Sequence, residues 1–356
     1  MDEYEIEELE RKAGIDRLHL LKVGGVGALA LAGLGSIGAG SAFARTTRSE
    51  GMLDFSGLKG KTVGISGVAV TSEAPARSAN YAKKLGAANG FKVQVVDTAG
   101  DYKKMSDTLK TWAQSKTVQA VISDVVSPSL IKEGMAECAK ANIPVAGIFA
   151  GWEPGLAIDV ASNDWVSSAK IATYIVDRLG GQGNVAILNW PNVPALQIRG
   201  AAIKAHLGFY KGIKIVSEQV LTVPGQVPDA KAKTKALLTK YPKGKLHCIV
   251  GGWDEVGVAA GQACKESGRG DVFVVGIDGN LASFDSIRAG DPFAATCAND
   301  MEAIAATALS QLSNILKGGK PSTNTIWVDA PFVAKQNVPA SGKFPIGLGE
   351  TAYYVK

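Results

Sequence analysis

Two neighbouring stretches decide the fold: Lys245-Leu-His-Cys-Ile-Val-Gly-Gly-Trp-Asp-Glu-Val256 and Asp271-Val-Phe-Val-Val-Gly-Ile-Asp-Gly-Asn280. Each contains a short apolar run that breaks at glycine and then places a polar or aromatic residue, a pattern typical of a buried parallel strand. The segment between them, 255–266, has helical character. Because open α/β sheets bind ligands at the carboxyl ends of their strands, this strand–helix–strand unit predicts that Trp253 and Asp278 bind a ligand.

The same alternation of strand and helix continues on both sides of this unit. Helical segments separate further apolar runs, and these runs predict strands at 62–67, 92–97, 118–123, 144–149, 157–161, 184–189, 213–221, 294–299 and 325–329. Strands that alternate with helices form parallel sheets that are covered on both faces. The sequence therefore predicts an α/β fold with two doubly wound parallel-sheet domains, which agrees with a length of 356 residues.

Residues 1–44 are predicted to form a signal peptide. An uncharged apolar run at 23–40 follows the basic residues Arg17 and Lys22, and Ala42-Phe-Ala44 offers a small-residue cleavage site. The run also approaches the minimum of about 17 to 20 residues that a membrane-spanning helix needs, so an uncleaved anchor is the alternative. The small residues and the cleavage site favour removal, and we expect an exported protein.

Charge gives no indication of nucleic-acid binding. Removal of residues 1–44 takes away four basic and seven acidic residues, which leaves 34 basic against 26 acidic residues and a net charge of +8. The basic residues are scattered rather than gathered in runs interleaved with aromatic residues. We interpret this charge as a contribution to solubility.

The cysteines and histidines do not predict a metal site. The four cysteines are Cys138, Cys248, Cys264 and Cys297, and none of them stands in a Cys-x-x-Cys pair or a zinc pattern. We expect buried free thiols, and a disulfide between Cys248 and Cys264 is the alternative in an exported protein. The three histidines lie in separate segments and form no metal set or catalytic triad. The sequence therefore predicts no cofactor, no metal and no enzymatic activity.

Five short strings, in register with the predicted elements, resemble the type I periplasmic sugar-binding proteins of ABC transporters. They are Ala141-Asn-Ile-Pro-Val145, Ala161-Ser-Asn-Asp164, Ile198-Arg-Gly200, Trp253-Asp-Glu255 and Val274-Val-Gly-Ile-Asp-Gly279. The resemblance covers residues 60–335. It implies the periplasm as the location of the mature protein.

The resemblance implies two lobes that are joined by a three-segment hinge. The first lobe would take 60–161 with 300–324, and the second would take 162–299 with 325–356. The hinge would lie near 161–163, 299–300 and 324–327. A ligand would bind in the cleft between the lobes, and closure of the hinge would trap it.

Some ligand positions carry over from the family directly. Asp278 matches a carboxylate that accepts hydrogen bonds from sugar hydroxyls, and Asn299 keeps the amide function of a glutamine. Asn163 matches a residue at the crossover between lobes, although capping of the following helix would also explain it. The resemblance therefore implies a polar, hydroxyl-binding part of the cleft.

Other positions depart from the family pattern. Ser72 and Trp253 stand where asparagines are usual, Gln197 stands in the place of an arginine, and Phe149 replaces the aspartate of an Asp-Arg pair. Aromatic faces stack on sugar rings, polyols or heteroaromatic rings, and they hold cations when carboxylates such as Asp124 are near. The ten candidate ligand-binding residues are Ser72, Asp124, Phe149, Trp152, Asn163, Trp190, Gln197, Trp253, Asp278 and Asn299.

The leading prediction is a monomeric solute-binding protein that delivers a sugar, polyol or similar small polar ligand to the permease of an ABC importer. A sensory module that presents its ligand to a membrane receptor or kinase is the alternative, and the sequence does not separate the two. A DNA-binding repressor is disfavoured because residues 1–44 hold an apolar run instead of a DNA-binding helix pair. An enzyme is disfavoured because no acid–base or nucleophile set is present.

Overall fold

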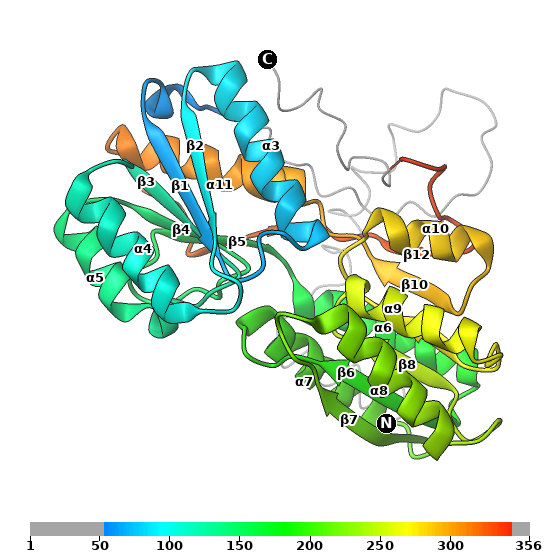
Figure 1. Cartoon of the computed structure of the whole chain (residues 1–356). Coiled ribbons are helices and arrows are strands. Elements are labelled where there is room, and N and C mark those ends of the chain that lie inside the picture. The colour runs from blue at the N-terminus through cyan, green and yellow to red at the C-terminus, as the bar shows by residue number, and fades with distance from the viewer. Residues whose placement is uncertain (1–52, 344–356) are drawn as a thin grey trace, which may run out of the picture. The chain divides into compact units, whose positions relative to one another are not determined.

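Two six-stranded sheets carry residues 53–343, the part of the chain that the computed structural model describes (Figure 1). The predicted signal peptide, 1–44, and the end of the chain, 344–356, lie outside the described residues. Among residues 53–343 no helix combines the length and the apolar character that a membrane span requires. We call the elements built on the first sheet the first lobe, and those built on the second sheet the second lobe.

The first sheet is parallel throughout, with the strand order β11-β5-β4-β3-β1-β2. Its strands are β1 (Thr62–Gly67), β2 (Lys92–Asp97), β3 (Ala120–Asp124), β4 (Val145–Ile148), β5 (Ile158–Ser162) and β11 (Thr325–Val328). Its helices are α3 (Glu73–Asn89), α4 (Tyr102–Ser115), α5 (Lys132–Lys140) and α11 (Met301–Leu316), with 3-10 turns η1 (Ser56–Leu58) and η2 (Pro128–Leu130). Helix α3 packs on α11 on one face, and α4 packs on α5 on the other (Figure 1).

The second sheet has the order β12-β10-β9-β8-β6-β7 and is parallel except for β12. Its strands are β6 (Gly183–Asn189), β7 (Ile213–Val220), β8 (Cys248–Gly251), β9 (Phe273–Val275), β10 (Phe293–Cys297) and β12 (Phe332–Ala334). Its helices are α6 (Asp164–Leu179), α7 (Pro194–Gly208), α8 (Gln226–Lys240), α9 (Asp254–Glu266) and α10 (Leu281–Ala289). Helices α6 and α7 pack together, as do α8 and α9, so this sheet is also covered on both faces (Figure 1).

Burial explains why the apolar runs of the sequence became strands. Every residue of β3, β4, β5, β8 and β9 is buried, as expected for strands that are covered by helices on both faces. The edge strands β2 and β7 are only partly buried. The predicted α/β fold with two doubly wound sheets is confirmed.

The assignment of residues 325–328 to the second lobe is wrong. Strand β11 pairs in parallel with β5, with Thr325 opposite Asp159, and so belongs to the first sheet. The physical reason is that β5 would otherwise expose an unpaired sheet edge. The chain crosses to the second lobe only after Val328, where β12 pairs antiparallel with β10. The third crossing therefore lies between β11 and β12, beyond the predicted 324–327.

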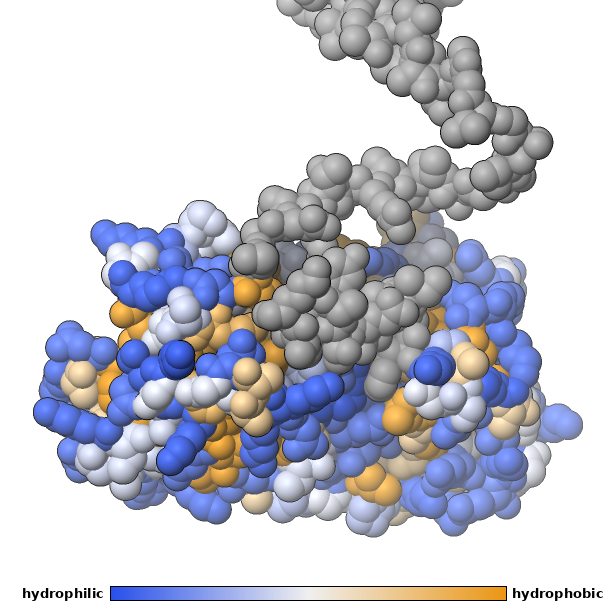
Figure 2. Space-filling view, turned by 90° about the horizontal axis from the view of Figure 1, so that it is seen from above, coloured by the Kyte–Doolittle hydropathy of each residue, from blue (hydrophilic) through white to orange (hydrophobic). Residues whose placement is uncertain are grey.

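The four cysteines are buried free thiols. Cys248 lies in β8 and Cys264 in α9, and the two are not bonded to each other. On the face of the molecule seen in Figure 2, hydrophilic side chains are spread over the surface and apolar side chains form separate patches.

Candidate functional site

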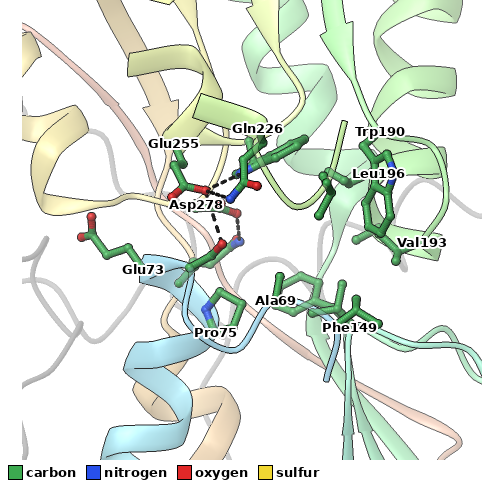
Figure 3. A pocket seen from close by; sticks show the side chains of 18 of the residues that line it. Ala69, Glu73, Pro75, Phe149, Trp190, Val193, Leu196, Gln226, Glu255 and Asp278 are labelled. Atoms are coloured by element: carbon green, nitrogen blue, oxygen red, sulfur yellow. Dashed lines mark hydrogen bonds between the residues drawn. The ribbon is translucent and has the colours of Figure 1, made fainter. Parts of the chain in front are cut away.

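A cavity lies where the carboxyl ends of the two sheets face each other (Figure 3). Its volume is about 730 Å³, which includes space that is open to solvent, and both lobes contribute to its lining. Parallel strands bring the segments that follow them to one sheet edge, so the lining comes from residues far apart in the sequence. A concave site that is lined from two lobes is typical of small-molecule binding.

Six of the ten predicted ligand-binding residues line this cavity. They are Ser72, Phe149, Trp190, Trp253, Asp278 and Asn299. Trp253 and Asp278, the two positions that the strand–helix–strand unit indicated, both lie on the second lobe and line the cavity.

The structure does not bring the other four to the cavity lining. Asp124 is buried at the end of β3, and the next residue, Val125, lines the cavity instead. The side chain of Trp152 is 39% exposed. Asn163 caps α6, because its side chain accepts a hydrogen bond from the backbone N–H of Val166. Gln197 is exposed on α7 and donates to the carbonyl of Pro191 at 3.1 Å.

Arg199 also lines the cavity, and it is one of the lining residues that sequence reasoning missed. It lies on the buried face of α7, three residues after Leu196, whereas Gln197 projects away from that face. Its Nε donates to Asp164 at 2.7 Å, and its Nη1 donates to Asp278 Oδ1 at 3.0 Å and to the Gly252 carbonyl at 3.1 Å. The period of α7 is the signal that would have separated the two positions.

This buried network fixes the carboxylate of Asp278. Its Oδ1 accepts from Arg199 and from Asn299 Nδ2, the latter at 3.2 Å. Burial raises the pKa of Asp278 to about 7, Arg199 opposes that rise, and the charge of Asp254 adds to it. Burial also raises the pKa of Asp254. Asp278 is thus held in place as a hydrogen-bond acceptor at the cavity wall.

The turn after Asp278 requires glycine. Gly279 has a φ of 71°, and a Cβ at this position would lie 2.4 Å from the Cβ of Ala298. Its backbone N–H and that of Asn280 donate to Asp254 Oδ2 at 2.8 and 3.0 Å. These bonds hold the start of the loop that carries Asn280 into the cavity lining.

Glu255 accepts hydrogen bonds from both lobes. Its Oε2 receives Gln226 Nε2 at 2.9 Å, Trp253 Nε1 at 3.4 Å and, from the first lobe, Ser72 Oγ at 3.3 Å (Figure 3). Ser72 occupies the N-cap position of α3 but makes no side-chain capping bond, because its hydroxyl turns to Glu255 instead. This is a direct polar contact across the cavity.

Two amide oxygens at the cavity have no donor. Asn280 and Asn299 are 2% and 1% exposed, and the Oδ1 of each accepts no hydrogen bond from any residue between 53 and 343. Buried polar atoms are normally paired, and both residues line the cavity. The site therefore offers acceptors to a bound molecule that carries hydroxyl or N–H donors.

Two residues of the first lobe hold a strained backbone at the cavity. Val125 has a φ of 65° and Phe149 a φ of 52°, both in the left-handed region that such side chains rarely adopt. Both line the cavity. Strain of this kind gathers at functional sites, and here it presents two apolar side chains to the cavity.

A sequence profile of the periplasmic binding protein domain matches residues 57–320. The chain belongs to the periplasmic binding protein family. The resemblance that was drawn from five short strings is thereby confirmed. Members of this family capture solutes rather than transform them, so this periplasmic binding protein is not an enzyme.

Individual relatives of this periplasmic binding protein bind polyols and sugars, by their names. The xylitol-binding protein of Mycolicibacterium smegmatis is 30% identical over 223 residues, which span 62% of each chain. The D-apiose import binding protein of Actinobacillus succinogenes is 25% identical over 73% of this chain and 85% of its own. A crystal structure of an ABC transporter solute-binding protein from Agrobacterium vitis with bound allitol covers 79% of this chain and 97% of its own, with 25% identity and a TM-score of 0.74.

Proposed function

We propose that this periplasmic binding protein captures a small polyol or sugar in the cavity between its lobes and delivers it to an ABC permease. The observation that carries the proposal is the set of acceptors at the cavity wall. Asp278 is oriented by Arg199, and the amide oxygens of Asn280 and Asn299 have no donor. A polyol supplies several hydroxyl donors on neighbouring carbons, which matches such a set.

The relatives support this choice of ligand. One is named for xylitol, one for D-apiose, and the solved structure from Agrobacterium vitis holds allitol. All three ligands are uncharged and rich in hydroxyls. The proposal extends this ligand chemistry to the present chain.

Binding selects a closed arrangement of the lobes. The first lobe takes 53–162 with 300–328, and the second takes 163–299 with 329–343. A solute that contacts Ser72 on one lobe and Asp278 on the other stabilises only the arrangement in which both are near. The three crossings between the sheets supply the hinge.

A thermal-shift screen tests the ligand. The protein is heated with pentitols, hexitols, pentoses and hexoses in turn, because a ligand that binds the folded state raises the apparent unfolding temperature. We expect at least one of these compounds to give a saturable shift that isothermal titration calorimetry reproduces. The absence of any shift across the whole set would overturn the proposed ligand class.

We also propose export to the periplasm, removal of residues 1–44, and action as a monomer that meets the permease at the membrane. Fractionation of expressing cells, with the mass of the mature chain, tests the first two points. Retention of full-length protein in the cytoplasm would contradict them. Uptake of the radiolabelled solute by cells with and without the gene for this chain tests delivery.

A further inference from the structure

The cavity has two chemically different ends, and the strand order of the second sheet explains the division. The segments that follow β10, β9 and β8 contribute Asn299, Asp278, Asn280 and Glu255. The segments that follow β6 and β7, at the other side of the same sheet, contribute the apolar or aromatic residues Trp190, Val193, Leu196 and Val223. They also contribute Arg199 and Gln226, but these two side chains donate to Asp278 and Glu255 and so belong to the polar end. The carboxyl ends of neighbouring strands lie side by side along one edge of the sheet. The polar side chains therefore gather at one end of this edge, and the apolar side chains gather at the other.

The first lobe continues the apolar end. Val68 follows β1, Val125 follows β3 and Phe149 follows β4, and all three line the cavity. In Figure 3, Phe149 lies with Trp190, Val193 and Leu196 on one side, while Glu73, Glu255 and Asp278 lie on the other. Both lobes thus contribute to an apolar wall that stands opposite the acceptors.

A hydroxyl group that entered the apolar end would find little to bind. Apart from the indole N–H of Trp190, the side chains there carry no hydrogen-bonding group. Val193 is 1% exposed and Leu196 8% exposed, so this wall belongs to the buried core of the cleft. Burial of a hydroxyl against such a wall leaves its hydrogen bonds unmade and is unfavourable. An apolar group at the same place gains the hydrophobic contribution instead.

We propose that the solute of this protein has two parts: a hydroxyl-bearing head that binds at Asp278, and an apolar substituent that lies against Leu196, Val193 and Phe149. The ligand class is a sugar or polyol that carries an alkyl or aryl group at one end. This inference rests on the proposed function, because it names the ligand class of the same cavity. It goes further in requiring that a free polyol fills only part of the site.

Isothermal titration calorimetry with matched ligands tests the inference. For each of D-xylose, D-ribose, L-arabinose, D-glucose and D-galactose, the free sugar is compared with its methyl, n-butyl and phenyl glycosides. For at least one of these sugars, we expect the n-butyl or phenyl glycoside to bind at least about tenfold more tightly than the methyl glycoside, because the added apolar area is buried.

The outcomes separate the two proposals. If free sugars or free pentitols bind but every n-butyl and phenyl glycoside binds no better than its methyl counterpart, the inference is overturned while the proposed function stands. If no sugar, polyol or glycoside binds, the proposed function itself fails, and the inference fails with it.

A pair of variants locates the apolar substituent. Leu196→Ser places a hydroxyl in the apolar wall, so we expect the affinity ratio of phenyl to methyl glycoside to fall toward one. Val220→Ser is the matched control, because Val220 is 63% exposed in β7 of the same lobe. It should leave the ratio unchanged. Thermal unfolding without ligand shows that each variant is folded, and an unchanged ratio in folded Leu196→Ser would overturn the placement.

Discussion

Each lobe has an aspartate at the carboxyl end of a strand, and the two aspartates have different surroundings. Asp278 follows β9 in the second lobe, lines the cavity and accepts hydrogen bonds from Arg199 and Asn299. Asp124 ends β3 in the first lobe, is 1% exposed, and neither of its oxygens has a partner among the described residues. A position at a strand tip therefore does not by itself place a side chain at the cavity.

The pKa of each aspartate is raised, but the balance of causes differs. Burial raises the pKa of Asp124 to about 8, and the charge of Asp97 adds to the effect. For Asp278, burial raises the pKa and Arg199 opposes it. The first aspartate is a group that folding drives toward its neutral form. Folding also raises the pKa of the second, to about 7, but there a buried arginine supports the charged form.

The largest expected change in the free energy of unfolding comes from replacement of Asp124. A carboxyl whose pKa is raised by folding favours the folded state below its unfolded pKa, near 3.9, and this contribution is lost as the pH rises through about 8. Asp124→Asn should therefore raise the free energy of unfolding above pH 8, by about 5 kcal/mol at most, with little change at pH 4. Urea unfolding across pH 4 to 9 measures this.

Asp107→Asn is the control for that experiment, because the Asp107 side chain on α4 is 47% exposed. It should leave the pH dependence of stability unchanged between pH 5 and 9. An Asp124→Asn protein with the parent's pH profile would show that the buried carboxyl has a partner that the structure lacks.

Removal of Arg199 should give the next largest effect. Arg199→Leu leaves Asp164 and Asp278 buried without their counter-charge, so the free energy of unfolding at pH 7 should fall by about 3–5 kcal/mol. Lys204→Leu on the same helix is the matched control. Its ion pair with Glu218 is roughly half exposed, and its loss should cost about 1 kcal/mol or less. Equal losses in the two variants would contradict a structural role for the buried network.

Replacement of Asp278 separates the two aspartates by function. Asp278→Asn removes the charge that strengthens hydrogen bonds to ligand hydroxyls, so the affinity for the tightest sugar or polyol of the screen should fall about 10- to 100-fold. Asp124→Asn should change that affinity less than about twofold, because Asp124 does not line the cavity. Calorimetry on both variants measures the two affinities. A larger loss of affinity in Asp124→Asn than in Asp278→Asn would contradict the proposed position of the binding site.

The contact between the lobes at Ser72 should give the smallest effect. Ser72→Ala removes the hydroxyl that donates to Glu255, a bond worth about 1 kcal/mol, so ligand affinity should fall roughly fivefold. Ser115→Ala, at the exposed end of α4, is the control and should leave affinity unchanged. An unaltered affinity in Ser72→Ala would mean that this bond does not favour the closed arrangement.

The sequence was informative where the signal is local. Apolar runs broken by glycine predicted the strands around Trp253 and Asp278, because strand and turn preferences depend on near neighbours. It was less informative about pairing at a distance. The edge that β11 completes lies on β5, more than 160 residues earlier, and no pattern within 325–328 indicates which sheet accepts it.

The same limit explains why some predicted residues lie outside the cavity lining. Asp124 has the same local pattern as Asp278, and only the fold shows that Val125, rather than Asp124, lines the cavity. Arg199 was overlooked because its partners, Asp164 and Asp278, come from other elements. The choice between Gln197 and Arg199 depends on which face of α7 is buried, and that face is set by packing against the sheet.

The order of the elements along the chain has a consequence for folding during synthesis. Helix α11 covers one face of the first sheet and β11 completes its edge, yet both are made after the whole of the second sheet except β12. A ribosome releases domains from the N-terminus, and most can fold as they emerge. The first lobe therefore cannot complete its fold until residue 328 has left the exit tunnel. Until then, part of its sheet stays uncovered. Residues 325–334 therefore connect the two lobes late in synthesis, because β11 completes one sheet and β12 the other within ten residues.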